Sequence, residues 1–275
     1  MNNFLQIIYI ASPLLLLTIG ALISEYAGRM AIFLDGIINL GGFLFFTFTV
    51  KSGMIFPSVL LSVFACSLLV FLTEKIASSL NANMFLVSLS LNIFSTALVS
   101  LLSSVIFSSR GILFSKEFIF SPGQVRIISS VICLALSFLT IVILKHSRLG
   151  LQIRISGSDA NVLDASGTSS KSIKSFSWII ASAFAALVGV SMTMRISSYV
   201  PGLSSGRGWT ALAAVFLGKK NPLLILLAVV VFALGEFLST NIQNISFFEN
   251  IPSSVLLSLP YLLALFLITI IPQKK

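Results

Sequence analysis

Long apolar stretches make up most of this chain, and the charged residues fall in the short gaps between them. Hydrophobic residues account for 57% of the 275 residues and charged residues for only 9%, whereas a typical soluble domain has about 25% charged residues. A surface so poor in charge would not stay dissolved in water, and about 20 apolar residues in a helix suffice to cross a bilayer. The sequence therefore predicts an all-α, polytopic integral membrane helical bundle.

We expect about eight to ten transmembrane segments, some of them interrupted helices, in a single transmembrane domain that covers residues 1–275. The apolar stretches behind this expectation are Phe4–Ile23, Met30–Val50, Phe56–Leu72, Met84–Phe107, Ile127–Leu144, Trp178–Met194, the short Trp209–Leu217, Pro222–Leu238 and Val255–Ile271. The longest polar stretch, about 145–175, is too short to bury a core of its own. We therefore expect no nucleotide-binding domain in the chain, and an ATP-driven motor would have to come from a partner.

Basic residues stand one or two at a time at the ends of the apolar stretches, and the net charge is +9. This placement is typical of the Lys and Arg excess in cytoplasmic loops, and there is no basic run with interleaved aromatic residues, so we expect no nucleic-acid partner. Segment Lys145–Lys174, the Lys219–Lys220 pair and the C-terminal Lys274–Lys275 are expected to be cytoplasmic. The side of the N-terminus stays open, because it depends on whether Met30–Val50 crosses the membrane or turns back.

Two apolar regions, Glu25–Phe43 and Gly206–Pro222, are interrupted by glycines and charges. Non-helical backbone at membrane depth is tolerated only where protein or water covers it. Transporters often carry such a broken helix in each half of the chain, on either side of the substrate path. The alternative is that the glycines only let helices pack closely. One interrupted region in each half favours a transporter.

Polar residues inside or beside these apolar regions are the candidate residues of a substrate pathway. They are Asp35, Asn39, Asn92, Arg207, Trp209 and Glu236. Charged groups inside a bilayer are costly and normally face a bundle interior or a water-filled cavity.

Each candidate also has a structural interpretation. Asp35 could cap a half-helix or accept hydrogen bonds from backbone amides in the break, and Glu236 could reach water from the outer end of its segment. Asn39 and Asn92 could hydrogen-bond neighbouring helices together, which is the commoner role of such residues. Because Arg207 is the one cation we find near a break, we expect a neutral solute rather than an anion.

No catalytic residue and no metal site can be assigned from the sequence, and we expect no enzyme activity and no cofactor. His146 is the single histidine and has no identifiable nucleophile or acid beside it in the sequence, and the common hydrolase, metalloprotease and phosphate-loop motifs do not occur. Cys66 and Cys133 lie inside apolar stretches, where cysteine usually acts as a small hydrophobic residue.

Four stretches occur in an order and spacing that resemble the membrane subunits of bacterial ABC importers in the branched-chain amino acid/ribose permease superfamily, nearest to its simple sugar and nucleoside branch. They are SPLLLLTIGALISEYAG at Ser12–Gly28 followed by DGIINLGGF at Asp35–Phe43, LGLQIRISGSDANVLDASG at Leu149–Gly167, SGRGWTALAAVFLGKKNPL at Ser205–Leu223, and LPY at Leu259–Tyr261. The chain departs from the usual family pattern at Tyr26, Ala31 and Asp35, where the family has Arg, Asn and Glu. A role of that Asn in binding solute or capping the break is therefore not carried over to this chain.

The resemblance implies that Leu149–Gly167 contains the coupling helix that docks into a separate ATP-hydrolysing subunit. The residues that match this loop are Arg154, Gly157, Asp159, Ala160, Asn161, Asp164, Ala165 and Gly167. On independent grounds, Asp159 is a good N-cap and Gly167 a good C-terminal stop for a short helix over Ala160–Ser166. An ordinary solvated helix is the alternative.

The resemblance also implies the partners: an ATP-binding subunit that itself binds ATP, a second, non-identical permease, and an extracytoplasmic substrate-binding protein. It places the chain as a multi-pass protein in the bacterial inner membrane, importing a nucleoside, a riboflavin-like heterocycle or a simple sugar. Two alternatives stay open. One is an ion-coupled secondary transporter that uses Asp35 and Glu236 as a relay, and the other is a membrane scaffold that moves nothing.

Overall fold

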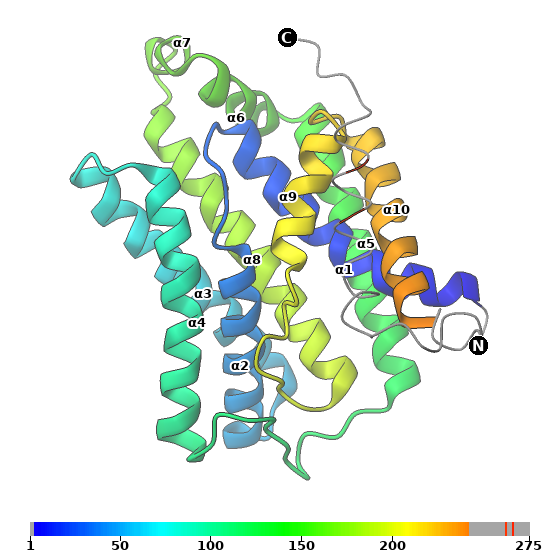
Figure 1. The fold of residues 1–275 in the computed structure, drawn as a ribbon. Coiled ribbons are helices and arrows are strands. Elements are labelled where there is room, and N and C mark those ends of the chain that lie inside the picture. Colours follow the sequence, from blue (N-terminus) through cyan, green and yellow to red (C-terminus); the bar gives the residue numbers. More distant parts are fainter. Residues whose placement is uncertain (1–2, 242–261, 263–265, 267–275) are drawn as a thin grey trace.

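The computed structural model describes residues 3–241, 262 and 266 (Figure 1). Over these residues the regular secondary structure is helical, and the one pairing of extended backbone is an isolated bridge between Leu113 and Tyr199. Seven of the described helices are long and apolar enough to cross a membrane. The predicted all-α polytopic bundle is therefore confirmed. The last predicted segment, Val255–Ile271, lies outside the described range apart from two residues.

The helices are α1 (Asn3–Tyr26), α2 (Leu34–Ser52), α3 (Ile55–Ser79), α4 (Met84–Phe107), α5 (Pro122–His146), α6 (Arg148–Ser158), α7 (Ala160–Ala165), α8 (Ser170–Ile196), α9 (Arg207–Leu217) and α10 (Pro222–Asn241). Most of them match a predicted apolar stretch, and α4 has the predicted bounds. The third stretch, in contrast, was expected to end at Leu72 but continues as α3 to Ser79. The reason is that Glu74, which the sequence suggested lay beyond the helix end, is buried against partners from other elements.

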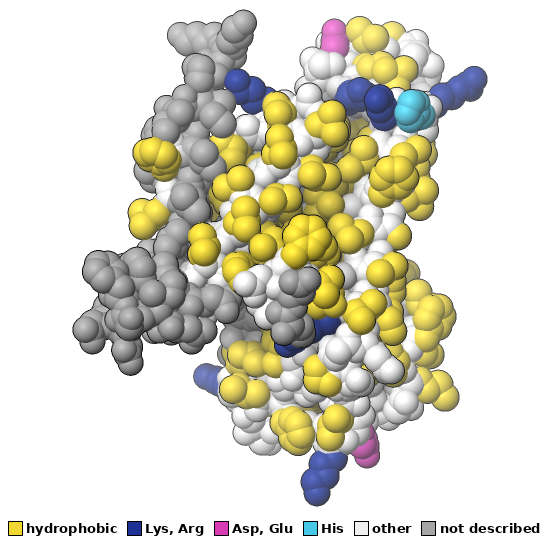
Figure 2. All heavy atoms as spheres, turned by 90° about the vertical axis from the view of Figure 1, so that its right-hand side faces the viewer, with side chains coloured by type: hydrophobic (Ala, Val, Ile, Leu, Met, Phe, Trp, Pro, Cys, Tyr) yellow, Lys and Arg dark blue, Asp and Glu magenta, His cyan; other side chains and the backbone are white. Residues whose placement is uncertain are grey.

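Helices α1, α2 and α8 form the interior of the bundle, and α3, α4, α5 and α10 surround them. The outer helices keep many large apolar side chains exposed, as lipid-facing helices do. Figure 2 shows hydrophobic side chains over the middle of one face, with most Lys and Arg side chains toward its two ends. This distribution fits a bundle that is surrounded by lipid at mid-height and by polar surroundings at both ends.

Close packing between α2 and α8 depends on small residues at their crossing. A Cβ atom on Gly41 would lie 2.7 Å from the Cα atom of Ala186, which leaves no room for a side chain. Glycine therefore lets the two backbones touch, as small residues do at many membrane helix interfaces. This is the alternative that the sequence left open for the glycines of the first interrupted region, and at Gly41 the geometry fits it.

Both interrupted regions contain a helix that begins inside the bundle; we call α2 and α9 half-helices for this reason, although α2 is itself long enough to cross a membrane. Residues 27–33 continue from α1 as turns and extended backbone, and α2 begins only at Leu34 (Figure 1). In the other half of the chain, residues 197–206 lead back from α8, and α9 begins at Arg207. Ala31, Ile32 and Phe33 are buried, so the non-helical backbone is covered by protein, as membrane depth requires.

Candidate functional site

Side chains of α4 cap the beginning of α2, which has no cap of its own. The first amides of a helix lack intrahelical acceptors. The Ser88 hydroxyl accepts hydrogen bonds from the amides of Ile32 (2.7 Å) and Phe33 (3.2 Å), and the Asn92 side-chain oxygen accepts one from the amide of Gly36 (2.6 Å). Asn92 therefore joins α4 to the start of α2, which agrees with the helix-joining interpretation of this residue.

Asp35 links the beginnings of the two half-helices. It lies in the first turn of α2, is 8% exposed, and its Oδ1 atom accepts a hydrogen bond of 2.9 Å from the amide of Gly208 in the first turn of α9. Helix N-termini carry partial positive charge, so a carboxylate between two of them is favourably placed. The geometry fits the first interpretation given for Asp35, the capping of a half-helix, because Gly208 is the second residue of α9.

Asn39 fastens the loop before α9 to the next turn of α2. Its Nδ2 atom donates to the Ser204 hydroxyl (3.2 Å), and its Oδ1 atom accepts from the Ser204 amide (3.0 Å). Asn39 also borders a small hollow of about 100 Å³ with Tyr199 and Arg110. The predicted residues Asp35, Asn39 and Asn92 thus gather around the two half-helix starts: Asn92 of α4 binds α2, and Asp35 and Asn39 of α2 bind α9 and the loop before it.

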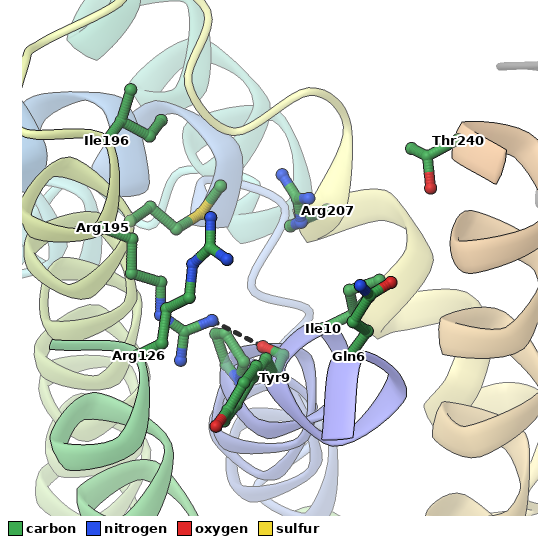
Figure 3. Close-up of a pocket in the computed structure, with 10 residues that line it drawn as sticks. Gln6, Tyr9, Ile10, Arg126, Arg195, Ile196, Arg207 and Thr240 are labelled. Atoms are coloured by element: carbon green, nitrogen blue, oxygen red, sulfur yellow. Dashed lines mark hydrogen bonds between the residues drawn. The ribbon is translucent and has the colours of Figure 1, made fainter. Parts of the chain in front are cut away.

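A larger cavity, of about 450 Å³, lies next to this cluster and is bordered by α1, α5, α8, α9 and α10. Polar and charged side chains reach it from all of these helices (Figure 3): Gln6, Tyr9, Arg126, Arg195, Arg207 and Thr240. Its volume is in the range of small-molecule sites, about 300–1,000 Å³.

Three guanidinium groups line this cavity. Arg207 forms an ion pair with Glu236 of α10. Arg195 donates to the hydroxyls of Ser129 and Ser130, at 2.8 Å each, and to the backbone oxygen of Tyr9 at 2.5 Å. Among the described residues, Glu236 is the one carboxylate paired with any of the three arginines.

Only Arg207 was expected to be a cation near a break, although Arg29 also lies within the first interrupted region. Arg126 and Arg195 were missed because they fall at the outer edges of the apolar stretches Ile127–Leu144 and Trp178–Met194, where a single Arg looks like an ordinary helix end. Both arginines lie at the helix ends away from the predicted cytoplasmic segment 145–175. Because basic residues are normally concentrated on the cytoplasmic side, this position was a signal that they have another role.

Trp209 reaches the cluster at Asp35 through its backbone, which hydrogen-bonds the Asp35 carboxyl group, whereas Glu236 pairs with Arg207. The Trp209 side chain is 48% exposed on α9, on the outside of the bundle. Glu236 forms an ion pair with Arg207. The sequence left open a simpler interpretation, in which the Glu236 carboxylate is solvated by water and has no protein partner. Of the six predicted pathway residues, the structure therefore gathers Asp35, Asn39 and Asn92 in one group and Arg207 with Glu236 in a second.

A buried ion pair that the sequence did not reveal lies near the end of α1. Arg29 donates to the carboxylate of Glu74 on α3, and the Ser175 hydroxyl of α8 donates to the same carboxylate. The Arg29 guanidinium also lies over the ring of Trp178, 5.9 Å from its centroid. The non-helical segment before α2 is therefore held at its beginning by charge as well as by packing.

The predicted coupling region lies at one end of the bundle, where α6 and α7 extend beyond the long helices (Figure 1). Arg154 donates to the backbone oxygen of Leu144 at 2.6 Å, which ties α6 to the end of α5. Gly157 packs directly on Gly28: a Cβ on Gly157 would lie 2.8 Å from the Gly28 nitrogen. Helix α6 thus contacts the turn that begins the first break.

Helix α7 has the N-cap that the sequence predicts. The Asp159 carboxylate accepts from the amides of Asn161 (3.1 Å) and Val162 (3.4 Å), and the helix covers Ala160–Ala165. Gly167 follows with a φ of +84°, a backbone conformation that favours glycine at a helix end. Asn161, Asp164 and Ala165 are exposed on this helix, whereas Ala160 is partly buried.

Asp164 fixes the junction between α7 and α8. Its carboxylate accepts from the Ser170 amide (2.7 Å) and from the Ser170 hydroxyl (2.9 Å). These hydrogen bonds stabilise the ionised form and lower the pKa of the Asp164 carboxyl from its ordinary value. The short helix is therefore held at both of its ends by carboxylates.

The same end of the bundle also carries the turn between α9 and α10. The Tyr26 hydroxyl donates to the backbone oxygen of Lys220 (2.6 Å), and the Lys220 ammonium pairs with Glu25 (3.0 Å). Lys220 and the α6–α7 region therefore both meet the end of α1. The sequence assigns the Lys219–Lys220 pair and segment 145–175 to one side of the membrane, and their position at one end of the bundle agrees with that.

A membrane bundle with two half-helices meeting at buried polar groups is the architecture of a transport subunit, and comparison with known families identifies which kind. The family model described as "Branched-chain amino acid transport system / permease component" matches residues 3–271. The chain therefore belongs to this family of permease components.

Curated relatives match along most of the chain. A guanosine ABC transporter permease protein, NupQ of Bacillus subtilis, is 25% identical over 281 residues, covering 94% of this chain and 88% of that protein. A nucleoside ABC transporter permease protein, NupC of Lactococcus lactis, is 24% identical over 298 residues, covering 96% and 93%. A putative glucose ABC transporter permease protein, TsgC13 of Haloferax volcanii, is 27% identical over 250 residues, covering 86% and 76%.

One solved structure has the same fold. The complex of PsaBC from Streptococcus pneumoniae with a Fab contains a chain that superposes with a TM-score of 0.57, at 16% identity, over 98% of this chain and 91% of that one. At this identity the likeness describes the fold alone.

Proposed function

We propose that this protein is the membrane-spanning permease subunit of a bacterial ABC importer in the cytoplasmic membrane. Residues 1–275 form one transmembrane permease domain, with segment 145–175 as its cytoplasmic coupling loop. It translocates a small neutral solute: a nucleoside, a riboflavin-like heterocycle or a simple sugar. An extracytoplasmic binding protein delivers the solute, a second, non-identical permease completes the pathway, and a separate ATP-binding subunit binds and hydrolyses ATP.

The observation that carries the proposal is the capped helix α7 at the end of the bundle. A helix held at both ends but exposed along its surface is suited to enter a groove on another protein. On α7, the Leu163 side chain is 2% exposed and packs against the rest of the bundle, whereas the Val162 side chain is 55% exposed. A buried anchor and an exposed apolar side chain on one short helix are what a docking element requires.

The contacts of α6 suggest how docking reaches the pathway. Gly157 touches Gly28, the Gly28 turn leads into residues 27–33, and these residues lead into α2 and Asp35. A push on α7 is thus transmitted to the first half-helix, and through the Asp35–Gly208 hydrogen bond to the second. In this mechanism ATP binding closes the motor subunits, and the closure shifts the permease between inward-open and outward-open states.

An ion-coupled secondary transporter that uses Asp35 and Glu236 has less support. Asp35 accepts from the Gly208 amide, and Glu236 is paired with Arg207, so both carboxylates already serve a structural contact. A proton or sodium relay would have to break these contacts in each cycle. Family membership adds to the case for ATP-driven transport.

The coupling role is tested by placing positive charge on α7. The double variant Asp159→Arg and Ala160→Arg removes the N-cap and adds bulk to the face that would enter the ATPase. We expect it to insert normally but to lose stimulation of the partner's ATPase activity and co-purification with it. A matched control adds arginines at the exposed C-terminal end of α3, as Ser79→Arg with Leu80→Arg, and should keep both. Normal stimulation by the α7 variant would refute the docking assignment.

The solute class is tested on the binding protein encoded with the importer. Its thermal stabilisation by nucleosides, riboflavin and pentoses would be measured first, and ATP-driven uptake of the stabilising solute second. Uptake that continues without the ATP-binding subunit would contradict the proposal.

A further inference from the structure

We propose that the arginine-lined cavity is a solute-binding site for a molecule that presents two adjacent hydrogen-bond acceptors. Such a pair occurs on the 6-oxo edge of a purine nucleoside and on the carboxylate of a sugar acid. The inference rests on the proposed function, since it gives the transported solute a place to bind within this subunit; the sugar-acid outcome would replace the neutral solute proposed above by an anion.

The position of the cavity suits a solute on its way through the bundle. It is bordered by α1 and α5 from the first half of the chain and by α8, α9 and α10 from the second. Arg207, which opens α9, reaches it from beside the break, next to the Asp35 carboxylate that binds the following residue. A solute here would therefore contact α9, the half-helix that the proposed mechanism links to α7 through Asp35.

The charge in the cavity is unbalanced within the described part of the chain. Three guanidinium groups and one carboxylate, that of Glu236, leave an excess of two positive charges. Arg195 is fixed by neutral groups only, through the bonds to Ser129, Ser130 and Tyr9 described above. Like charges in a site of low dielectric constant repel each other strongly. An acceptor-rich solute would reduce this repulsion, whereas a donor-rich solute would not.

Arg126 is the cavity residue that we expect to determine solute specificity. Its guanidinium points into the cavity between Arg195 and Arg207 (Figure 3), and no hydrogen bond from it is found to the part of the chain that the structure describes. It is therefore available to a ligand, whereas Arg195 is already held by the protein. The ring of Tyr9 borders the same space and offers a surface for stacking.

Guanidinium geometry decides which solute groups fit. Two N–H donors lie parallel on one edge of Arg and match two adjacent acceptors, as on a carboxylate or at O6 and N7 of a 6-oxopurine. Adenine carries an amino donor at position 6, so the same edge cannot bind both atoms. A neutral 6-oxopurine nucleoside thus satisfies the cavity without being an ion, and a sugar acid satisfies it as an anion.

The test compares solute preferences of the complete importer, reconstituted with its ATP-binding subunit, second permease and binding protein. ATP-driven uptake of inosine is compared with adenosine, and that of glucuronate with glucose. The variants are Arg126→Gln and Arg126→Lys. Because all variants use the same binding protein, a change in preference reports on the permease. Lys116→Gln, in the exposed loop between α4 and α5, removes the same charge away from the cavity and serves as control.

We expect the wild type to prefer one or both acceptor-bearing solutes, and Arg126→Gln to reduce that preference by roughly 5- to 150-fold, the range for a good bidentate pair. Arg126→Lys, which keeps the charge but not the paired donors, should lose most of the preference too. A preference within the purine pair assigns the 6-oxo edge, and one within the sugar pair assigns the carboxylate.

Two results with the Arg126 variants would overturn the inference while leaving the importer proposal intact. One is ATP-driven uptake with the same preferences in wild type and Arg126→Gln, and the other is full rescue by Arg126→Lys, which would reduce the effect to charge alone. Absence of ATP-driven uptake of all four solutes, alongside uptake of another solute that stabilises the binding protein, would also overturn the inference and leave the importer proposal intact. If only Lys116→Gln changed the preference, the site would lie elsewhere.

Discussion

Removing Glu74 from the buried ion pair at the start of the first break should cost a large part of the stability of this bundle. The Glu74 side chain is 2% exposed and that of Arg29 is 10% exposed. If one partner is removed, water therefore cannot reach the remaining charge and solvate it. In Glu74→Met the Arg29 guanidinium keeps its charge but loses its carboxylate, and Ser175 loses its acceptor. Breaking one side of a buried pair costs about 3–5 kcal/mol.

The double variant Arg29→Met with Glu74→Met separates this cause from a simple loss of packing. It removes both buried charges at once and fills the space with apolar groups of similar length. Such replacements are often neutral or stabilising. We therefore expect the double variant to recover most of the stability lost in Glu74→Met.

The free energy of unfolding can be followed in detergent through tryptophan fluorescence. Trp178 is fully buried and has the Arg29 guanidinium over its ring, so its emission reports on this contact. Glu25→Gln, which breaks the half-exposed pair with Lys220, is the matched control, and should lose only about 0–1 kcal/mol. The reasoning is refuted if Glu74→Met loses no more than this control, or if the double variant loses as much as the sum of its single variants.

Three further perturbations test other parts of the bundle. Asp35→Asn keeps an acceptor for the α9 amide but removes the charge between two helix N-termini, so uptake should fall several-fold with little change in expression; wild-type uptake would leave Asp35 with a purely structural role. Gly157→Val places a side chain where α6 touches the turn after α1, and should lower ATPase stimulation while solute binding to the separate binding protein is unchanged. Because hydrogen bonds from Ser170 lower the pKa of Asp164, this carboxylate stabilises the α7–α8 junction above its ordinary pKa of about 4, and the contribution is lost as the pH falls through the lowered folded pKa. Protection factors of the α7 amides, in which the pH dependence of intrinsic exchange is divided out, should accordingly fall at low pH in the wild type, and Asp164→Asn should show the reduced protection already at neutral pH with little further change on acidification.

Local features were predictable from the sequence because they depend on neighbouring residues. The apolar length of Met84–Phe107 sets the bounds of α4, and Asp159 with Gly167 marks α7, since a cap and a stop act within one or two turns. The two breaks were also recognisable, because glycines and charges inside an apolar stretch conflict with an uninterrupted helix.

Long-range pairings were not predictable from the residues alone. Nothing near Glu74 in the sequence signals that Arg29 and Ser175 lie beside it, and a charge three-quarters of the way along α3 resembles the end of a span. The cavity arginines were missed for the same reason, since Arg126 and Arg195 acquire a common role only when α5 and α8 are brought together by α1. A charge inside an apolar stretch can be recognised in a single sequence, but the distant residue that pairs with it cannot.

The shared carboxylate at position 35 ties the evolution of the two halves of the chain together. A side chain at Gly208 would bring its Cβ to 2.8 Å from the Asp35 nitrogen, so bulk at one position and loss of the acceptor at the other disrupt the same contact. Their energetic penalties should overlap rather than sum, as for any two residues that depend on one bond. A change tolerated in one half of the pathway thus limits which changes the other half can accept.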